Sequence, residues 1–149
     1  MNVVGSTIAR MCDMGLYTHS GIEVGVASTK NIIGQLAVLI LMALSLGQKR
    51  DLQVKDVREI IRKMKEMPLK FEEQLQNAKK IIPIVAKYSK YQNFFFLGRN
   101  LLYGTAAECS LKLKELTYLH AECYSSGELK HGPLALISPE MPAIVLNLK

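Results

Sequence analysis

The sequence is poor in cysteine and has no segment of low complexity. Its three cysteines, Cys12, Cys109 and Cys123, are odd in number and lack the paired spacing of a metal site. This spacing argues against a disulfide framework and against a structural zinc site. No basic and apolar leader with a small-residue cleavage site opens the chain. A reducing cytoplasm, with three free thiols, is therefore the expected setting.

Long hydrophobic runs are also scarce. The one candidate for a membrane span covers residues 31–47, NIIGQLAVLILMALSLG, which is short, contains Gln35, and lies between Lys30 and Lys49. A membrane-spanning helix needs about 20 apolar residues, whereas a helix inside a protein core does not. Because this segment is apolar nearly all round, we expect a helix buried between a sheet and another helical layer. No membrane partner is predicted.

The net charge of +6 comes from one segment. Residues 49–90 contain twelve Lys or Arg and six Asp or Glu, and the rest of the chain contains seven of each. The segment mixes both signs at amphipathic spacing and lacks the interleaved aromatic residues of a single-strand binding surface. We therefore predict solvated helices here and no nucleic-acid partner.

Periodicity gives a coarse outline of the elements. Residues 52–66 are predicted to form a helix that Pro68 closes, and residues 71–78 continue the pattern into a third helix. Pro83 is expected to break that helix or to start a short one ending near Tyr88. Strands are predicted at residues 2–6, 16–19, 93–97 and 143–148.

Polar residues are placed most specifically after Gly104. Residues 104–118 are predicted to form a helix that begins at Gly104 and Thr105. At 100° per residue, Glu108, Lys112 and Glu115 share one stripe that lies on the apolar side, and the polar back consists of Ser110, Lys114 and Thr117. Such a stripe is expected to face a cleft or a subunit seam.

Two carboxylates on either side of one ammonium group form a coupled set. Burial raises a carboxyl pKa and the lysine lowers it, which is the kind of tuning that suits a general base. The alternative is a helix-surface network worth only tenths of a kcal/mol per pair. The next segment, HAECYSSGELKHGPLALI, favours a site because it gathers titratable groups in a loop around Gly127 and Gly132.

Metal binding by His120, Cys123 and His131 is a further possibility within this segment. The spacing is irregular and no second pair of cysteine or histidine residues is present. A nucleophilic pair of Cys123 and His131 has no better support. No metal and no cofactor are predicted, and His120 is assigned a structural role.

A second block, GIEVGVASTK, occupies residues 21–30, directly before the long apolar helix. Small residues at the start of a helix leave backbone N–H groups free to hold an anion, and Ser28, Thr29 and Lys30 add donors. A plain helix cap is the alternative interpretation.

These two blocks resemble the isomerase region of the glutamine:fructose-6-phosphate amidotransferase family. The similarity rests on LKLKELTYLHAE, SGELKHGPLAL and GIEVGVASTK, and it runs from NVVGS to the last residue. It implies an α/β fold of the sugar isomerase (SIS) type, flavodoxin-like, with a parallel sheet between helices and with the second sheet incomplete. Residues 1–48 would end one SIS domain, residues 49–90 would form a helical connection, and residues 91–149 would begin a second domain.

The resemblance also implies a chemistry: glucosamine 6-phosphate is made from fructose 6-phosphate and ammonia released from glutamine. By position, Glu115 would transfer the proton between C1 and C2, with Lys112 and Glu108 as its charge partners. His131 would open the sugar ring in the site of a neighbouring subunit, which implies a homo-oligomer such as a dimer. Val26, through its backbone, and Ser28, through its side chain, would bind the sugar phosphate.

The sequence departs from the family in several places. Asn100 stands where the family usually has a second glycine, and the glutaminase domain, the phosphate loop of the first SIS domain and the tail lysine have no counterpart here. The isolated chain is therefore expected to have little or no synthase activity. A fructosamine-phosphate deglycase or isomerase and a non-catalytic sugar-phosphate-binding SIS module remain alternatives, although a pure binding module would not need the full set of acidic and basic residues.

Overall fold

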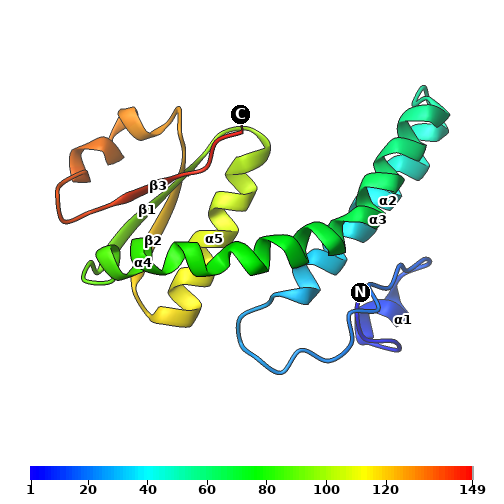
Figure 1. Cartoon of the computed structure of the whole chain (residues 1–149). Helices are drawn as coiled ribbons and strands as arrows, with labels where there is room; N and C mark the ends of the chain where they lie inside the picture. The colour runs from blue at the N-terminus through cyan, green and yellow to red at the C-terminus, as the bar shows by residue number, and fades with distance from the viewer. Residues whose placement is uncertain (149) are drawn as a thin grey trace. The chain divides into compact units, whose positions relative to one another are not determined.

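The computed structural model describes residues 1–148. They form two compact units, the first ending at Gln76 and the second beginning at Asn77 (Figure 1). The predicted α/β class with a parallel sheet is confirmed, and the sheet lies in the second unit.

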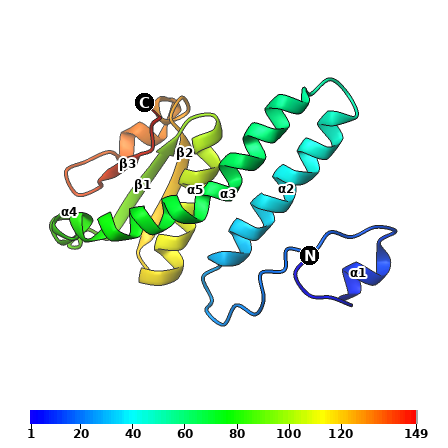
Figure 2. The same cartoon turned by 45° about the vertical axis from the view of Figure 1, so that its right-hand side comes forward.

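The first unit is built on two long helices, α2 (Lys30–Gln48) and α3 (Val54–Asn77), after a short helix α1 (Thr7–Met11). The long helices run antiparallel, side by side (Figure 2). Their turn is tight because the backbone N–H groups of Arg50 and Leu52 both donate to the carbonyl of Gly47, at 2.9 and 3.1 Å. The Leu52 side chain packs against Gly47, where a Cβ atom would lie 3.0 Å from it.

Helix α2 is where the first unit departs most from expectation. It was predicted to be buried between a sheet and a helical layer, but Leu44 is its only buried residue. The reason is topological, since every strand in the described part of the chain belongs to the second unit, so the first unit has no sheet of its own to cover α2. By length and composition, α2 would also be able to cross a membrane.

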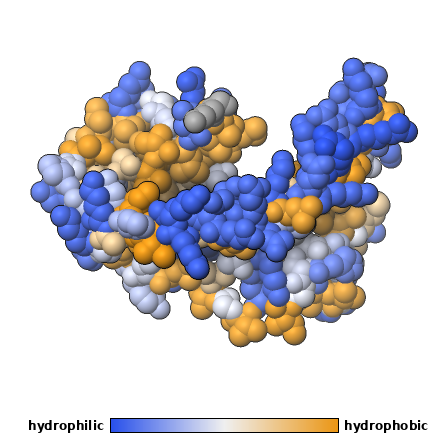
Figure 3. Space-filling view, in the orientation of Figure 1, coloured by the Kyte–Doolittle hydropathy of each residue, from blue (hydrophilic) through white to orange (hydrophobic). Residues whose placement is uncertain are grey.

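Pro68 does not end a helix, contrary to the prediction. It lies inside α3, which continues to Asn77, so residues 54–77 form one helix where two were expected. An interior proline removes only one backbone hydrogen bond, and the long runs of helix-forming residues on either side compensate for that loss. The side of α3 turned toward the viewer in Figure 3 is hydrophilic, as expected for an amphipathic surface helix.

Neither strand predicted near the amino terminus is present. Residues 3–5 form a turn, and residues 16–19 take part in no strand ladder, with His19 at φ 51°. Two hydrogen bonds join these segments, from the Met1 amine to the Leu16 carbonyl at 2.9 Å and from the Thr18 N–H to the Met1 carbonyl at 2.8 Å. The Asn2 side chain adds bonds to Thr18 and Ser20 at 3.0 Å each. Side-chain contacts thus replace the sheet pairing that the apolar pattern suggested.

The second unit begins with the 3₁₀ turn η1 (Ala78–Ile81) and helix α4 (Ile82–Tyr88). Pro83 lies in the first turn of α4, as predicted. Strand β1 (Asn93–Gly98) begins the sheet. Helix α5 (Leu101–Thr117) then connects it to the second strand, β2 (His120–Ser125). The 3₁₀ turns η2 (Leu129–His131) and η3 (Pro133–Leu136) precede the last strand, β3 (Ala143–Val145).

All three strands are parallel, in the order β2-β1-β3, so the predicted strands at 93–97 and 143–148 are confirmed, the latter for its first three residues. Gly98 pairs with Ser125 and Leu97 with Val145 in the register. Phe94 and Phe96 pack on α5 through Ala106, together with Ala121 of β2. Phe95 is fully buried, with its ring centroid 5.5 Å from that of Tyr124. The near-continuous apolar run of β1 is typical of a buried parallel strand.

Helix α5 begins earlier than predicted. Its first residue is Leu101, and Gly104 lies inside the first turn. Asn100 precedes it with φ 52° and ψ −124°, a conformation that favours glycine. Ser110 was placed on the polar back of the helix but is only 2% exposed. Small residues, Ala106 and Ser110, let the helix approach the sheet closely, and the leucines therefore flank the contact.

Candidate functional site

The predicted charged stripe forms on α5. Lys112 Nζ donates to Glu115 Oε2 and lies 3.4 Å from Glu108 Oε1, so one ammonium group is shared by two carboxylates. The side chains of Lys112, Glu115 and Glu108 are 21%, 25% and 34% exposed. The stripe is therefore half-buried, at the boundary between the packed face of α5 and its solvent face.

The two ion pairs change the pKa of Lys112. The hydrogen bond from Lys112 to Glu115, together with the charges of Glu115 and Glu108, raises the pKa of the Lys112 ammonium group, although partial burial opposes this. Lys112 therefore stays charged at neutral pH and holds the Glu115 carboxylate in a defined position. A carboxylate held in place next to a fixed cation can accept and return a proton, which is the chemistry expected of Glu115.

Helix geometry separates this stripe from the carboxyl ends of the strands. Leu101 begins α5 just after β1 ends at Gly98, and the helix then runs back along the sheet. Glu115 lies fourteen residues further on, which corresponds to about 21 Å along the axis at 1.5 Å per residue. The stripe thus lies near the end of the unit where β1 and β2 begin.

His131 lies at the other end. It closes η2 in the loop that leaves β2 at Ser125, the residue that pairs with Gly98 at the carboxyl end of β1. Its side chain is exposed, and within residues 1–148 no hydrogen bond or ion pair connects it to the stripe. The two parts of the predicted site, Glu115 and His131, therefore lie at opposite ends of α5 within one copy of the chain.

The loop before α2 holds an anion of its own. The Glu23 carboxylate accepts hydrogen bonds from the backbone N–H groups of Thr29 at 2.8 Å and Lys30 at 3.0 Å. It also accepts from the hydroxyl groups of Thr29 at 2.9 Å and Ser28 at 3.2 Å. These donors, the backbone N–H of Thr29 first, lower the pKa of Glu23. The N–H groups that were expected to be free are thus occupied.

Glu23 was not singled out from the sequence. The signal was an acidic residue just upstream of a helix start, where the helix dipole favours negative charge. The predicted binding residues flank this cap: Ser28 is one of its donors, and the Val26 side chain is 92% exposed. A ligand that uses the Ser28 hydroxyl has to compete with Glu23 for it.

The outer face of β2 carries a second polar group that sequence reasoning left unassigned. The Tyr124 hydroxyl donates to Glu122 Oε2, and His120 Nε2 lies 3.3 Å from Glu122 Oε1. This hydrogen bond to Glu122 raises the pKa of the Tyr124 hydroxyl. The three residues alternate along a strand, so they share one face. His120, predicted to be structural, is thus a member of a local network.

Burial raises the pKa of the Cys123 thiol, and that of Cys109 as well. A nucleophilic cysteine needs a lowered thiol pKa. The Cys123 Sγ atom instead faces the Tyr103 carbonyl at 4.0 Å, on the α5 side of the sheet. This placement agrees with a packing role. Across residues 1–148, no three His, Cys, Asp or Glu side chains are grouped so as to hold a metal ion.

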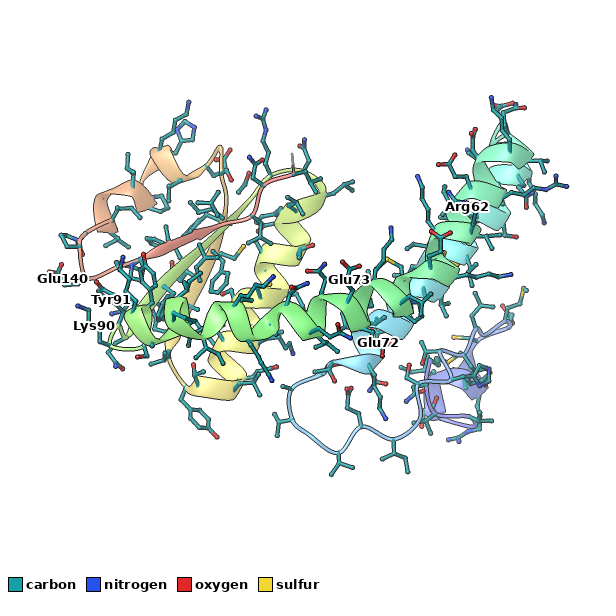
Figure 4. The ribbon with its side chains drawn as sticks, viewed as in Figure 1. Arg62, Glu72, Glu73, Lys90, Tyr91 and Glu140 are labelled. Atoms are coloured by element: carbon teal, nitrogen blue, oxygen red, sulfur yellow. The ribbon has the colours of Figure 1, made fainter. Side chains whose placement is uncertain are left out.

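Two open cavities lie at opposite ends of the sheet. One, of about 540 Å³, is lined by Lys90, Tyr91, Gln92, Asn93, Pro139 and Glu140, and Figure 4 shows Lys90, Tyr91 and Glu140 gathered there. The other, of about 430 Å³, lies at the carboxyl ends of β1 and β2. None of the predicted catalytic or binding residues lines either cavity.

Comparison with known proteins identifies the second unit. Residues 87–149 match the SIS domain. The second unit is therefore similar to the SIS domain over most of its length. The C-terminal domain of a glucosamine-fructose-6-phosphate aminotransferase from Francisella tularensis superimposes with a TM-score of 0.91 at 39% identity, over 97% of this chain and 41% of that one. The expected SIS-type fold is therefore confirmed along nearly the whole chain.

Curated relatives carry the same name. The isomerizing glutamine–fructose-6-phosphate aminotransferase of Haemophilus influenzae is 45% identical over 146 residues, and that of Thermus thermophilus is 41% identical over 150. The matches cover 97% and 100% of this chain. The chain spans only about a quarter of those relatives, 24% and 25% of their length. The chain is thus related to one continuous part of these aminotransferases.

Proposed function

We propose that this chain is part of the isomerase region of an isomerizing glutamine–fructose-6-phosphate aminotransferase. That enzyme would convert fructose 6-phosphate and glutamine-derived ammonia into glucosamine 6-phosphate for amino-sugar synthesis in the cytoplasm. The observation that carries the proposal is the half-buried network of Glu108, Lys112 and Glu115 in a chain that resembles named aminotransferases along nearly its whole length. The names of these relatives favour this activity over a deglycase.

Glu115 is the proton-transfer base in this proposal. It takes a proton from one of the two sugar carbons C1 and C2 and returns it to the other, so the net charge of the site is unchanged when the step is complete. Lys112 holds the carboxylate in place through its hydrogen bond, and Glu108 balances the second side of the ammonium group. Such general acid–base help contributes about 10²- to 10⁴-fold to a rate.

The opposite placement of Glu115 and His131 supports a site shared between two copies. His131 serves ring opening in the proposal, so it has to reach the same sugar as Glu115. The two lie at opposite ends of a helix of seventeen residues, so one copy does not bring them together. A homodimer in which each copy supplies one of the two residues satisfies both roles.

The sugar phosphate would be held by the loop before α2, through the Val26 backbone and the Ser28 hydroxyl. Residues 1–48 would close the first SIS domain, residues 49–90 would connect the domains, and residues 91–149 would begin the second. The exposed apolar side chains of α2, among them Ile33, Leu36 and Leu39, are consistent with a sheet packed on this helix in the longer protein. The isolated chain is therefore expected to turn over little or no fructose 6-phosphate.

The shared site has a direct test. In a chimera, residues 1–149 replace the matching quarter of the Haemophilus influenzae aminotransferase. Glu115→Gln and His131→Asn are made in separate preparations, and each alone is expected to be inactive. The two preparations are then combined and allowed to exchange subunits. Half of the resulting dimers contain one copy of each variant, and in each of these heterodimers one of the two sites is intact. Activity should then return to about a quarter of the unmutated chimera.

Recovery requires that the two residues come from different copies. No recovery after proven subunit exchange would contradict the shared site. Full activity of either single variant would contradict the role of that residue.

A further inference from the structure

The cavity at the carboxyl ends of β1 and β2 is unused by the proposed function. It is lined by Arg99 and Asn100 after β1, Ser125, Ser126 and Gly127 after β2, and Lys130 from η2. No acidic residue lines it. The two loops are tied together at its base, where the Ser126 N–H donates to the Gly98 carbonyl at 2.9 Å.

We propose that this cavity binds the phosphate group of a small phosphate ester, independently of the proposed catalytic function. Arg99 and Lys130 supply two positive charges from two different loops, and Ser125 and Ser126 add hydroxyl groups to the same lining. Within residues 1–148, none of these four side chains has a hydrogen-bond or ion-pair partner. A doubly charged, oxygen-rich ligand would satisfy all of them.

The surroundings favour an anion over other ligands. Two positive charges that line one cavity repel each other, and an anion bound between them would offset that repulsion. The positive end of the α5 dipole, a helix of seventeen residues, points toward the same place. The cavity lies beyond the carboxyl ends of parallel strands, where open α/β sheets bind ligands. Its volume of about 430 Å³ leaves room for more than the phosphate group, which is the reason to expect an ester.

Asn100 fits this proposal. It takes up φ 52° and ψ −124° to turn the chain from β1 into α5 beside the cavity. Arg99 and Asn100 of this turn line the cavity together with Ser126.

The test uses the 149-residue chain labelled with ¹⁵N. It is titrated with inorganic phosphate and with fructose 6-phosphate, while sodium chloride keeps the ionic strength constant. Saturable shifts should be confined to the amides of residues 98–102 and 125–131, and the ester should bind at least as tightly as inorganic phosphate. Shifts at residues 26–30 would instead report the proposed sugar-phosphate loop, so the two proposals fail separately.

Lys130→Gln should weaken phosphate binding on the order of tenfold or more, because a charge-assisted hydrogen bond is lost. Lys90→Gln is the matched control, since Lys90 lines the cavity at the other end of the sheet. It should leave the affinity unchanged. If Lys130→Gln loses its fold, the residues that shift in the unmutated chain decide the question.

Three results would overturn the proposal. The first is shifts that stay linear with phosphate and spread over the basic surface. The second is an equal loss of affinity in Lys130→Gln and Lys90→Gln. The third is binding of inorganic phosphate without binding of the ester.

Discussion

Helices α3 and α5 carry charged pairs of the same design in different surroundings. On α3, Lys63 lies 2.7 Å from Glu59 and Arg62 lies 2.6 Å from Glu66. These side chains are 41–60% exposed. On α5, Lys112 is shared by Glu108 and Glu115 and is only 21% exposed. Spacing along a helix therefore cannot separate a solvated network from a candidate site, and partial burial does.

The difference arises from what each helix packs against. Helix α5 lies on the sheet, where Ala106 and Ser110 bring it close to Phe94 and Phe96, so residues at the edge of that contact are half-covered. Among the described residues of the first unit, Leu44 and Val57 are the only buried hydrophobic residues. The charges of α3 are therefore surrounded by water, where such pairs contribute little. The setting of the α5 network depends on the core beneath it.

Phe96→Ala is the change that should disturb this setting most. The side chain is 6% exposed and packs on α5, so its loss leaves a cavity and should destabilise the second unit by about 3–5 kcal/mol. Phe71→Ala on α3, where Phe71 is 46% exposed, is the control and should cost less than about 1 kcal/mol. Urea denaturation followed by circular dichroism measures both. Equal losses would show that the second unit has no more core than the first.

Gly98→Ala should have the next largest effect. A Cβ atom there would lie 2.3 Å from the Leu102 carbonyl oxygen and 2.8 Å from the Tyr103 nitrogen, so α5 would have to move away from β1. The expected loss is about 1–3 kcal/mol. Gly104→Ala, where nothing lies within 4 Å, should instead stabilise α5 by about 0.5–1 kcal/mol. If both substitutions had the same sign in a denaturation experiment, the account of this turn would be wrong.

The smallest expected effect concerns pH. The pKa of Lys112 is raised in the folded chain by its bond to Glu115, so its contribution to stability is fully present below the unfolded pKa near 10.5 and is lost as pH rises through the folded pKa. The difference in denaturation midpoint between the unmutated chain and Lys112→Met should therefore be constant from neutral pH to about 10 and shrink above that. Lys63→Met should show a smaller difference at neutral pH. A Lys112 difference that grows in alkali would contradict the assigned pair.

Much of the second unit could be predicted from the sequence because its signals are local. The run NFFFL, the strand at residue 143, the start of α4 at Pro83 and the charged stripe at fixed helical spacing each depend on a few neighbouring residues. The end of β1 and the start of α5 were less accurate. Asn100 takes a conformation that glycine usually provides, and only the backbone shows that it does so.

The first unit was harder because its pattern depends on what covers it. The apolar residues of α2 suggested a core helix, yet the first unit has no strand of its own to cover α2. Pro68 suggested a helix end, and cooperative hydrogen bonding on both sides carried α3 through it. The expected anion position before α2 is taken by Glu23, five residues from Ser28, which no periodicity could indicate. The roles of Val26, Ser28, Glu115 and His131 stay predictions.

The most direct test of the central claim compares two glutamates in the same chimera with the Haemophilus influenzae aminotransferase. Glu115→Gln and Glu59→Gln each remove one carboxylate paired with a lysine on a helix. Conversion of fructose 6-phosphate to glucosamine 6-phosphate is followed as the rate of product formation at saturating substrate. The account predicts that Glu115→Gln lowers the rate by about 10²-fold or more while sugar-phosphate binding persists, and that Glu59→Gln leaves it unchanged. Equal rates in the two variants would contradict it.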